Sequence, residues 1–140
     1  MNNKFKIMEL KNSDGNVYFE LGYQPEFNWG LTNWIGWVQV EEVKAGGMQM
    51  LELIKKYHIK YWLNDNRELE GSWDDANEWI ANFWIPNVLK AGLEKYSVIV
   101  PNNLPAQLSS EFMADNAEKT TLKMLNVQTE QEAIDWLLKK

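Results

Sequence analysis

The residues with the clearest chemical potential lie together in the middle of the chain. Asn64, Asp65, Asn66 and Arg67 follow an apolar run that predicts a buried strand over residues 59–65. Ligands of α/β sheets usually bind at the carboxyl ends of strands, so this turn is a candidate ligand- or partner-binding site. Arg67 could hold a carboxylate or phosphate through two parallel hydrogen bonds. In the alternative interpretation Arg67 pairs with Asp65 and the cluster is structural.

Tryptophan is the second unusual feature, with eight residues in a chain of 140. Periodicity assigns most of them to the core faces of one strand and one helix, at Trp29, Trp37, Trp73 and Trp84. Trp34 and Trp79 fall outside these stripes. They are therefore candidates for a pocket rim or a partner-binding patch.

Several familiar kinds of site are not indicated. The chain has no cysteine and a single histidine, His58, so neither a metal centre nor a thiol nucleophile is expected. It also lacks a G-x-S-x-G motif and the glycine-rich phosphate loops. We expect no catalytic residue, no metal and no cofactor, although one sequence does not exclude a pair of catalytic carboxylates.

Ser72 is predicted to begin a helix and not to be a phosphorylation site. Its side chain should accept a backbone N–H from Asp74 or Asp75, as an N-cap does. A phosphate at Ser72 would meet like-charge repulsion from these two carboxylates.

The formal net charge of −6, from 14 basic and 20 acidic residues, argues against binding to nucleic acid or to anionic membranes. No apolar run is long enough for a transmembrane segment or a signal peptide. We therefore expect a cytoplasmic protein of one domain over residues 1–140. Its partner would be a protein or a small molecule, and a homodimer is possible.

The pattern of elements predicts an α/β fold with five strands and four helices. The strands are expected over residues 16–23, 27–40, 59–65, 95–101 and 122–128. The helices are expected to begin near Glu41, Ser72, Leu104 and Thr129, with a kink before Pro86 and a possible break near Ser109. Strands that alternate with helices imply a largely parallel sheet, and the opening pair adds an antiparallel hairpin.

Several segments resemble bacterial STAS-like proteins, the distant relatives of the anti-sigma-factor antagonist stage II sporulation protein AA. These segments are WIGWV, LIKKYHIKYWLNDNREL, NEWIANFWIPNVLKAG and KYSVIVP, with L-x-D-x-R at residues 63–67 and W-x-P at residues 84–86. The resemblance implies a layered STAS-like domain and a non-enzymatic role as a switch or binding module. In antagonists a phosphorylated serine lies in a D-S-S turn, whereas this chain has Asp65-Asn66-Arg67-Glu68 there.

The leading hypothesis is therefore a STAS-like binding or regulatory module that acts through a protein partner or a small ligand. The alternative is a carrier of small or lipid-like molecules, or an enzyme, with a pocket between the Asp65–Arg67 turn and the Trp73–Trp84 helix. A roomy pocket with Arg67 pointing inward would favour the alternative. A closed core between these elements would favour the interaction module.

Overall fold

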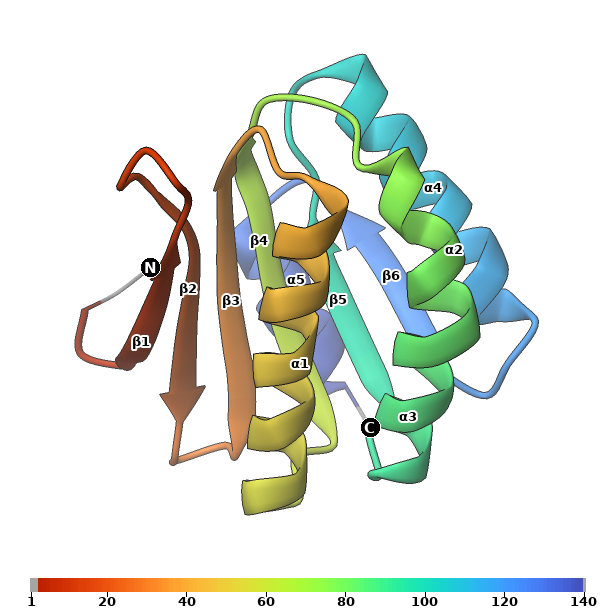
Figure 1. Ribbon diagram of the computed structural model, residues 1–140. Helices are drawn as coiled ribbons and strands as arrows, with labels where there is room; N and C mark the ends of the chain where they lie inside the picture. Colours follow the sequence, from red (N-terminus) through yellow and green to blue (C-terminus); the bar gives the residue numbers. More distant parts are fainter. Residues whose placement is uncertain (1–2, 140) are drawn as a thin grey trace.

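A six-stranded mixed β-sheet forms the centre of the computed structural model, which describes residues 3–139 (Figure 1). The strands are β1 (Lys6–Lys11), β2 (Val17–Gln24), β3 (Trp29–Gly36), β4 (Tyr61–Leu69), β5 (Lys95–Ile99) and β6 (Lys123–Val127). They lie side by side in the order of the sequence. Strands β1 to β3 pair antiparallel, and β3 to β6 pair parallel. The prediction of an α/β fold with an antiparallel start is confirmed.

The prediction of five strands is wrong, because β1 adds a sixth at the edge of the sheet. Its sequence, KIMELK, alternates charged and apolar residues, and none of its side chains is fully buried. Charged side chains are common on edge strands, where they discourage pairing with another chain. Because of these charged residues, β1 was not recognised as a strand from the sequence.

Helices cover both faces of the sheet, but unequally (Figure 1). The helical segments are α1 (Val40–Tyr57), η1 (Asp74–Ala76), α2 (Asn77–Trp79), η2 (Ile80–Trp84), α3 (Ile85–Lys90), α4 (Leu104–Glu118) and α5 (Glu130–Leu138). The segments from α1 to α4 lie on one face, and α5 alone lies on the other. Within the described residues no helix is long and apolar enough to cross a bilayer.

The two faces carry separate apolar cores. The larger core lies under α1 to α4 and includes Phe19, Trp62 and Ile54, none of which has exposed surface. The smaller core lies under α5 and joins Trp29, Leu63, Ile99, Val127, Ala133 and Leu137. Burying apolar surface on both sides is what parallel strands require.

The helical run around Pro86 widens where a kink was predicted. Proline has no N–H and cannot complete the bond to the residue four positions earlier. The helix accommodates Pro86 through the π-helical turn η2, in which the Ile85 N–H bonds to the Ile80 carbonyl. Helical structure therefore continues on both sides of Pro86 without a break.

Other features of the structure also differ from the sequence-based predictions. The helix α4 runs unbroken through Ser109, contrary to the expected break, because the Ser109 side chain bonds to the neighbouring segment 72–74. Strand β3 stops at Gly36, whose φ of +74° turns the chain, so the side chain of Trp37 is 70% exposed and not in the core. Phe83 is also 39% exposed, although helical periodicity with Trp73 and Trp84 would place it inward.

Close packing of α1 on the sheet depends on Gly46 and Gly47. A Cβ atom at Gly46 would lie 2.4 Å from Cη2 of Trp34 and 2.9 Å from Cδ2 of Phe19. At Gly47 it would lie 2.9 Å from Cη2 of Trp79. The two glycines therefore leave room for indole rings under the helix.

We predict that Gly46→Ala lowers the free energy of unfolding. The gain in helix propensity is about 1 kcal/mol, but overpacking of the Trp34 ring costs about 1–3 kcal/mol. Urea denaturation should show a net loss, whereas Gln49→Ala on the exposed side of α1 should change stability by less than about 0.5 kcal/mol. A Gly46→Ala variant that is more stable than the natural chain would contradict this packing.

Candidate functional site

An extra residue in β4 decides which polar side chains reach which face of the sheet. Asn33 of β3 pairs with Asp65, but Ile35 pairs with Glu68, so the register shifts by one residue between them. Such a bulge places Asp65 and Glu68 on the same face although they are three residues apart. The predicted turn at Asp65–Arg67 is thus wrong: β4 continues to Leu69 through pairing with β3.

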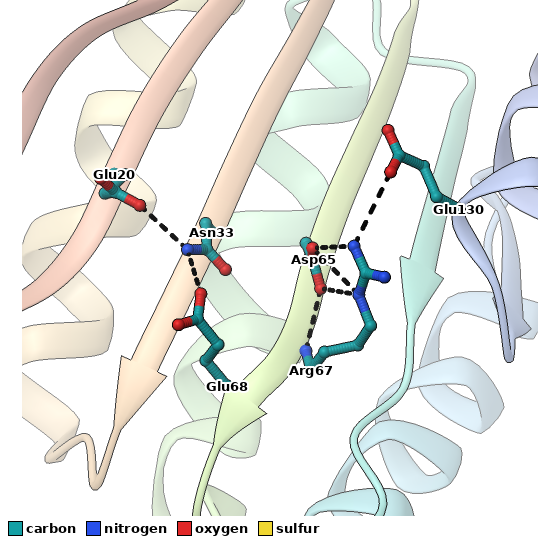
Figure 2. Close-up of polar contacts among 6 residues, drawn as sticks. All are labelled: Glu20, Asn33, Asp65, Arg67, Glu68 and Glu130. Atoms are coloured by element: carbon teal, nitrogen blue, oxygen red, sulfur yellow. Dashed lines mark hydrogen bonds and ion pairs between the residues drawn. The ribbon is translucent and has the colours of Figure 1, made fainter. Parts of the chain in front are cut away.

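Asp65 and Arg67 form an ion pair on the α5 face of the sheet (Figure 2). The guanidinium donates from Nε to Oδ1 at 3.0 Å and from Nη2 to Oδ2 at 2.7 Å, and the Arg67 backbone N–H donates to Oδ1 at 2.9 Å. Glu130 of α5 lies 3.8 Å from Nη2. These hydrogen bonds, led by Asp65, raise the pKa of Arg67 above its usual value. Arg67 is therefore engaged by protein carboxylates on the side of the sheet away from the Trp73–Trp84 segment.

A second polar cluster continues across the same face toward the edge of the sheet (Figure 2). The amide nitrogen of Asn33 donates to Glu20 at 2.9 Å and to Glu68 at 2.7 Å. Glu20 also receives the Lys6 ammonium at 2.8 Å. Burial acts to raise the pKa of Glu20, but the bonds from Lys6 and Asn33 outweigh it and leave this pKa below its usual value. The cluster holds two carboxylates in place, on the two strands that flank β3.

On the opposite face, a chain of buried hydrogen bonds crosses from β3 to β4. The indole N–H of Trp62 donates to the Thr32 hydroxyl at 2.9 Å, and this hydroxyl donates to Oδ1 of Asn64 at 2.5 Å. The amide nitrogen of Asn64 donates to Oδ1 of Asn66 at 2.8 Å. These four side chains are at most 4% exposed. We call them the buried relay.

The buried relay ends at a cavity between the sheet and the helical layer. The cavity measures about 50 Å³. Its walls include four indole rings and two amides, from Trp34, Trp73, Trp79, Trp84, Asn64 and Asn66. The π-helical turn η2 supplies Trp84, whose indole N–H is fixed by the Gly47 carbonyl at 3.0 Å. Turns of this kind are frequent at functional sites.

The sequence-based candidates thus divide between the two faces. Trp34, Trp79 and Asn66 line the cavity, whereas Asp65 and Arg67 form the ion pair on the other side. Trp73 and Asn64 also line the cavity; the sequence analysis placed Asn64 in the candidate turn and Trp73 on the helix beside the alternative pocket. The period of two along β4 could have shown that Asn64 and Asn66 share a face, opposite Asp65.

Ser72 makes the predicted hydrogen bond and is tied to α4, but it lies one residue before the N-cap, which is Trp73. Its Oγ accepts the Asp74 N–H at 3.1 Å. Ser109 of α4 receives the Trp73 N–H at 3.1 Å and donates to Oδ1 of Asp74 at 2.5 Å. His58 lies at the end of α1, before β4, whereas this cluster follows β4. The serines and the histidine are therefore at opposite ends of the sheet.

A metal centre is not evident either. In residues 3–139 no three histidine, aspartate or glutamate side chains come together as a metal site requires. The carboxylates of the α5 face are instead bonded to Lys6, Asn33 and Arg67.

The arrangement of the sheet and helices is a SpoIIAA-like fold, and the resemblance to STAS-like proteins is confirmed at the level of the fold. The chain is similar in structure to an uncharacterised protein of the DUF3478 family from Shewanella loihica PV-4 that has this fold. The TM-score is 0.51, the identity is 16%, and the match covers 85% of this chain and 93% of that chain. No protein-family model and no curated protein matches the sequence.

We predict that the Asp65–Arg67 pair is a modest structural contact. Asp65→Asn and Arg67→Ala should each lower the free energy of unfolding by about 1 kcal/mol, because the pair is bidentate but partly exposed. The double variant should lose less than the sum of the two. Chemical denaturation tests this, with Lys60→Ala, which breaks a 3.9 Å exposed pair with Glu94, as control. Strictly additive losses would show that the two residues act independently.

We predict that Glu20 stabilises the protein only above mildly acidic pH. Its folded pKa is lowered, so its contribution is present above the unfolded pKa of about 4.3 and is lost as pH falls through the folded value. The stability difference between the natural chain and Glu20→Gln should therefore shrink as the pH is lowered from 6 to about 3. Urea midpoints across this range measure it, with Glu26→Gln in the exposed β2–β3 turn as control. A difference that grows with acidity would contradict the prediction.

Proposed function

We propose that the chain is a non-enzymatic, cytoplasmic STAS-like binding module that docks a basic segment of a protein partner on α4. The observation that carries this proposal is an apolar stripe on the outer side of that helix. Leu104, Leu108 and Phe112 recur every four residues and are 64%, 51% and 55% exposed. Side chains at this spacing lie on one face of a helix. Exposed apolar patches of this kind often mark protein interaction sites.

Charge beside the stripe selects the kind of partner. Leu108 and Phe112 line an open groove of about 500 Å³ together with the carboxylates of Asp74, Glu111 and Asp115. Residues 70–89 and 101–118, which surround it, contain seven acidic residues and no lysine, arginine or histidine. A segment that combines apolar side chains with lysine or arginine would match both properties.

Two other occupants fit less well. A second copy of this chain would bring another acidic groove to the same place, and like charges across an interface are repulsive. The carrier or enzyme hypothesis requires an internal site for the ligand, but binding pockets usually measure about 300–1,000 Å³. The interior cavity measures about 50 Å³, and Arg67 points away from it.

Site-specific photo-crosslinking tests the proposal. A photoreactive phenylalanine analogue is placed at Phe112 in the cells from which the protein comes. The control carries the same analogue at Ile7 of β1, which is also about half exposed. We expect a discrete adduct from Phe112 only, joined to a partner segment that is rich in lysine or arginine.

The captured segment, synthesised as a peptide, should then bind the purified protein. Phe112→Ser should weaken its Kd at least about tenfold, as loss of an aromatic anchor does, and Ile7→Ser should leave it unchanged. Added salt should also weaken binding. Equal crosslinking from both positions, or an acidic captured segment, would overturn the proposal.

A further inference from the structure

The hydrogen bonds of the buried relay all run in one direction. This direction determines whether the relay ends at the cavity with a donor or with an acceptor. An indole N–H can only donate, so Trp62 makes the Thr32 hydroxyl an acceptor and leaves its own proton for Asn64. Oδ1 of Asn64 is thereby occupied, and its amide nitrogen donates to Oδ1 of Asn66. The remaining group of Asn66 is its amide nitrogen, a donor. No hydrogen bond from this nitrogen is found among the described residues.

A second donor without a partner belongs to Tyr96, another residue of the cavity wall, whose hydroxyl makes no hydrogen bond among the described residues. The indole N–H of Trp73 also has no partner in the described part of the chain, but its nitrogen is not accessible from the cavity. Burial raises the pKa of Tyr96, so the phenol stays neutral and keeps its proton. A buried donor that lacks an acceptor costs about 1–3 kcal/mol.

The rest of the wall is uncharged. The side chains around the cavity are apolar or neutral, and none of them carries a lysine, arginine, aspartate or glutamate charge. An ion placed here would lose its hydration without gaining an opposite charge. The occupant that suits this wall is therefore neutral.

Size limits the occupant further. The cavity of about 50 Å³ compares with about 10–15 Å³ that one water molecule requires by the same measure. It thus accommodates roughly four water-sized groups. Val38, Val43 and Trp73 also line an open groove at the start of α1, so the cavity and this groove share part of their walls.

We propose that this cavity is a binding site for a small uncharged molecule of about four non-hydrogen atoms that carries a hydrogen-bond acceptor. The acceptor receives the amide N–H of Asn66 and the O–H of Tyr96, and the apolar part lies against the indole rings. A short ketone has this chemistry. The site is independent of the partner surface on α4.

Three probes of one shape isolate the features that the cavity requires. Acetone, acetate and isobutene are all planar with four non-hydrogen atoms. Acetone is a neutral acceptor, acetate adds a charge, and isobutene lacks an acceptor. The readout is the indole N–H resonance of Trp73 in the ¹H–¹⁵N spectrum of the full chain. We expect a saturable shift with acetone, and binding at least about tenfold weaker with acetate and isobutene.

A variant separates the phenol donor from the ring. Tyr96→Phe keeps an aromatic wall and removes the O–H, so acetone should bind about fivefold more weakly by the shifts of neighbouring amides. Trp136→Phe, on the α5 face, should leave acetone binding unchanged. The three-probe comparison needs no variant and stands if Tyr96→Phe does not fold.

Three results would overturn the proposal. A Trp73 resonance that does not move with acetone, in a cavity that holds only long-lived water, would make the cavity a hydration site. Equal affinity for isobutene and acetone would show that no acceptor is selected. Tighter binding of acetate than of acetone would show that the site prefers an anion.

Discussion

The register shift in β4 is the constraint on which the polar architecture of this protein depends. A regular strand would send Asp65 and Arg67 to one face and Glu68 to the other. With one extra residue between the Asn33 and Ile35 pairings, Glu68 joins Asp65 on the α5 face. Glu68 can then meet Asn33 at 2.7 Å. Charged groups are thereby gathered on one side of the sheet, and only neutral amides remain on the other.

Neutral amides are what the larger core can tolerate. Asn64 and Asn66 are almost fully buried beneath the helices, where an ionised group without a partner would be costly. Above them, α1 packs so closely that a Cβ atom at Gly47 would lie 2.9 Å from Cη2 of Trp79. Large rigid rings packed against a close helix leave a gap that flexible side chains would fill. The cavity is thus a product of the tryptophans and the glycines together.

The sequence predicts the structure correctly where local conformational preference and tertiary packing favour the same conformation. The hydrogen bond that Ser72 accepts from Asp74 and the parallel order of β4, β5 and β6 were both predictable, because each is set by residues close in sequence or by a clear apolar run. Gly92, which follows α3, adopts a φ of +110°, and a glycine is the usual signal for this conformation at the end of a helix. Such signals require no knowledge of the partner elements.

Prediction failed where neighbouring strands override local preference. Asn64–Arg67 has low strand propensity, yet β3 and β5 hold much of it in the sheet from either side. Trp37 follows the period of β3 only until Gly36 turns the chain. For the candidate site, Trp34 and Trp79, which fall outside the main apolar stripes, both line the cavity, whereas the direction of Arg67 depends on the bulge. A bulge has no clear signature in a single sequence.

The strands lie in the sheet in the same order as in the sequence, and this has a consequence for biosynthesis. Every strand pairs with the strand made immediately before it, so no pairing has to wait for a distant part of the chain. The sheet can grow one strand at a time as the polypeptide leaves the ribosome. The α5 helix is the exception, since it is translated after all six strands and covers the apolar side chains of Trp29, Leu63 and Ile99. Until α5 is made and packs on the sheet, this apolar face stays exposed to chaperones and proteases.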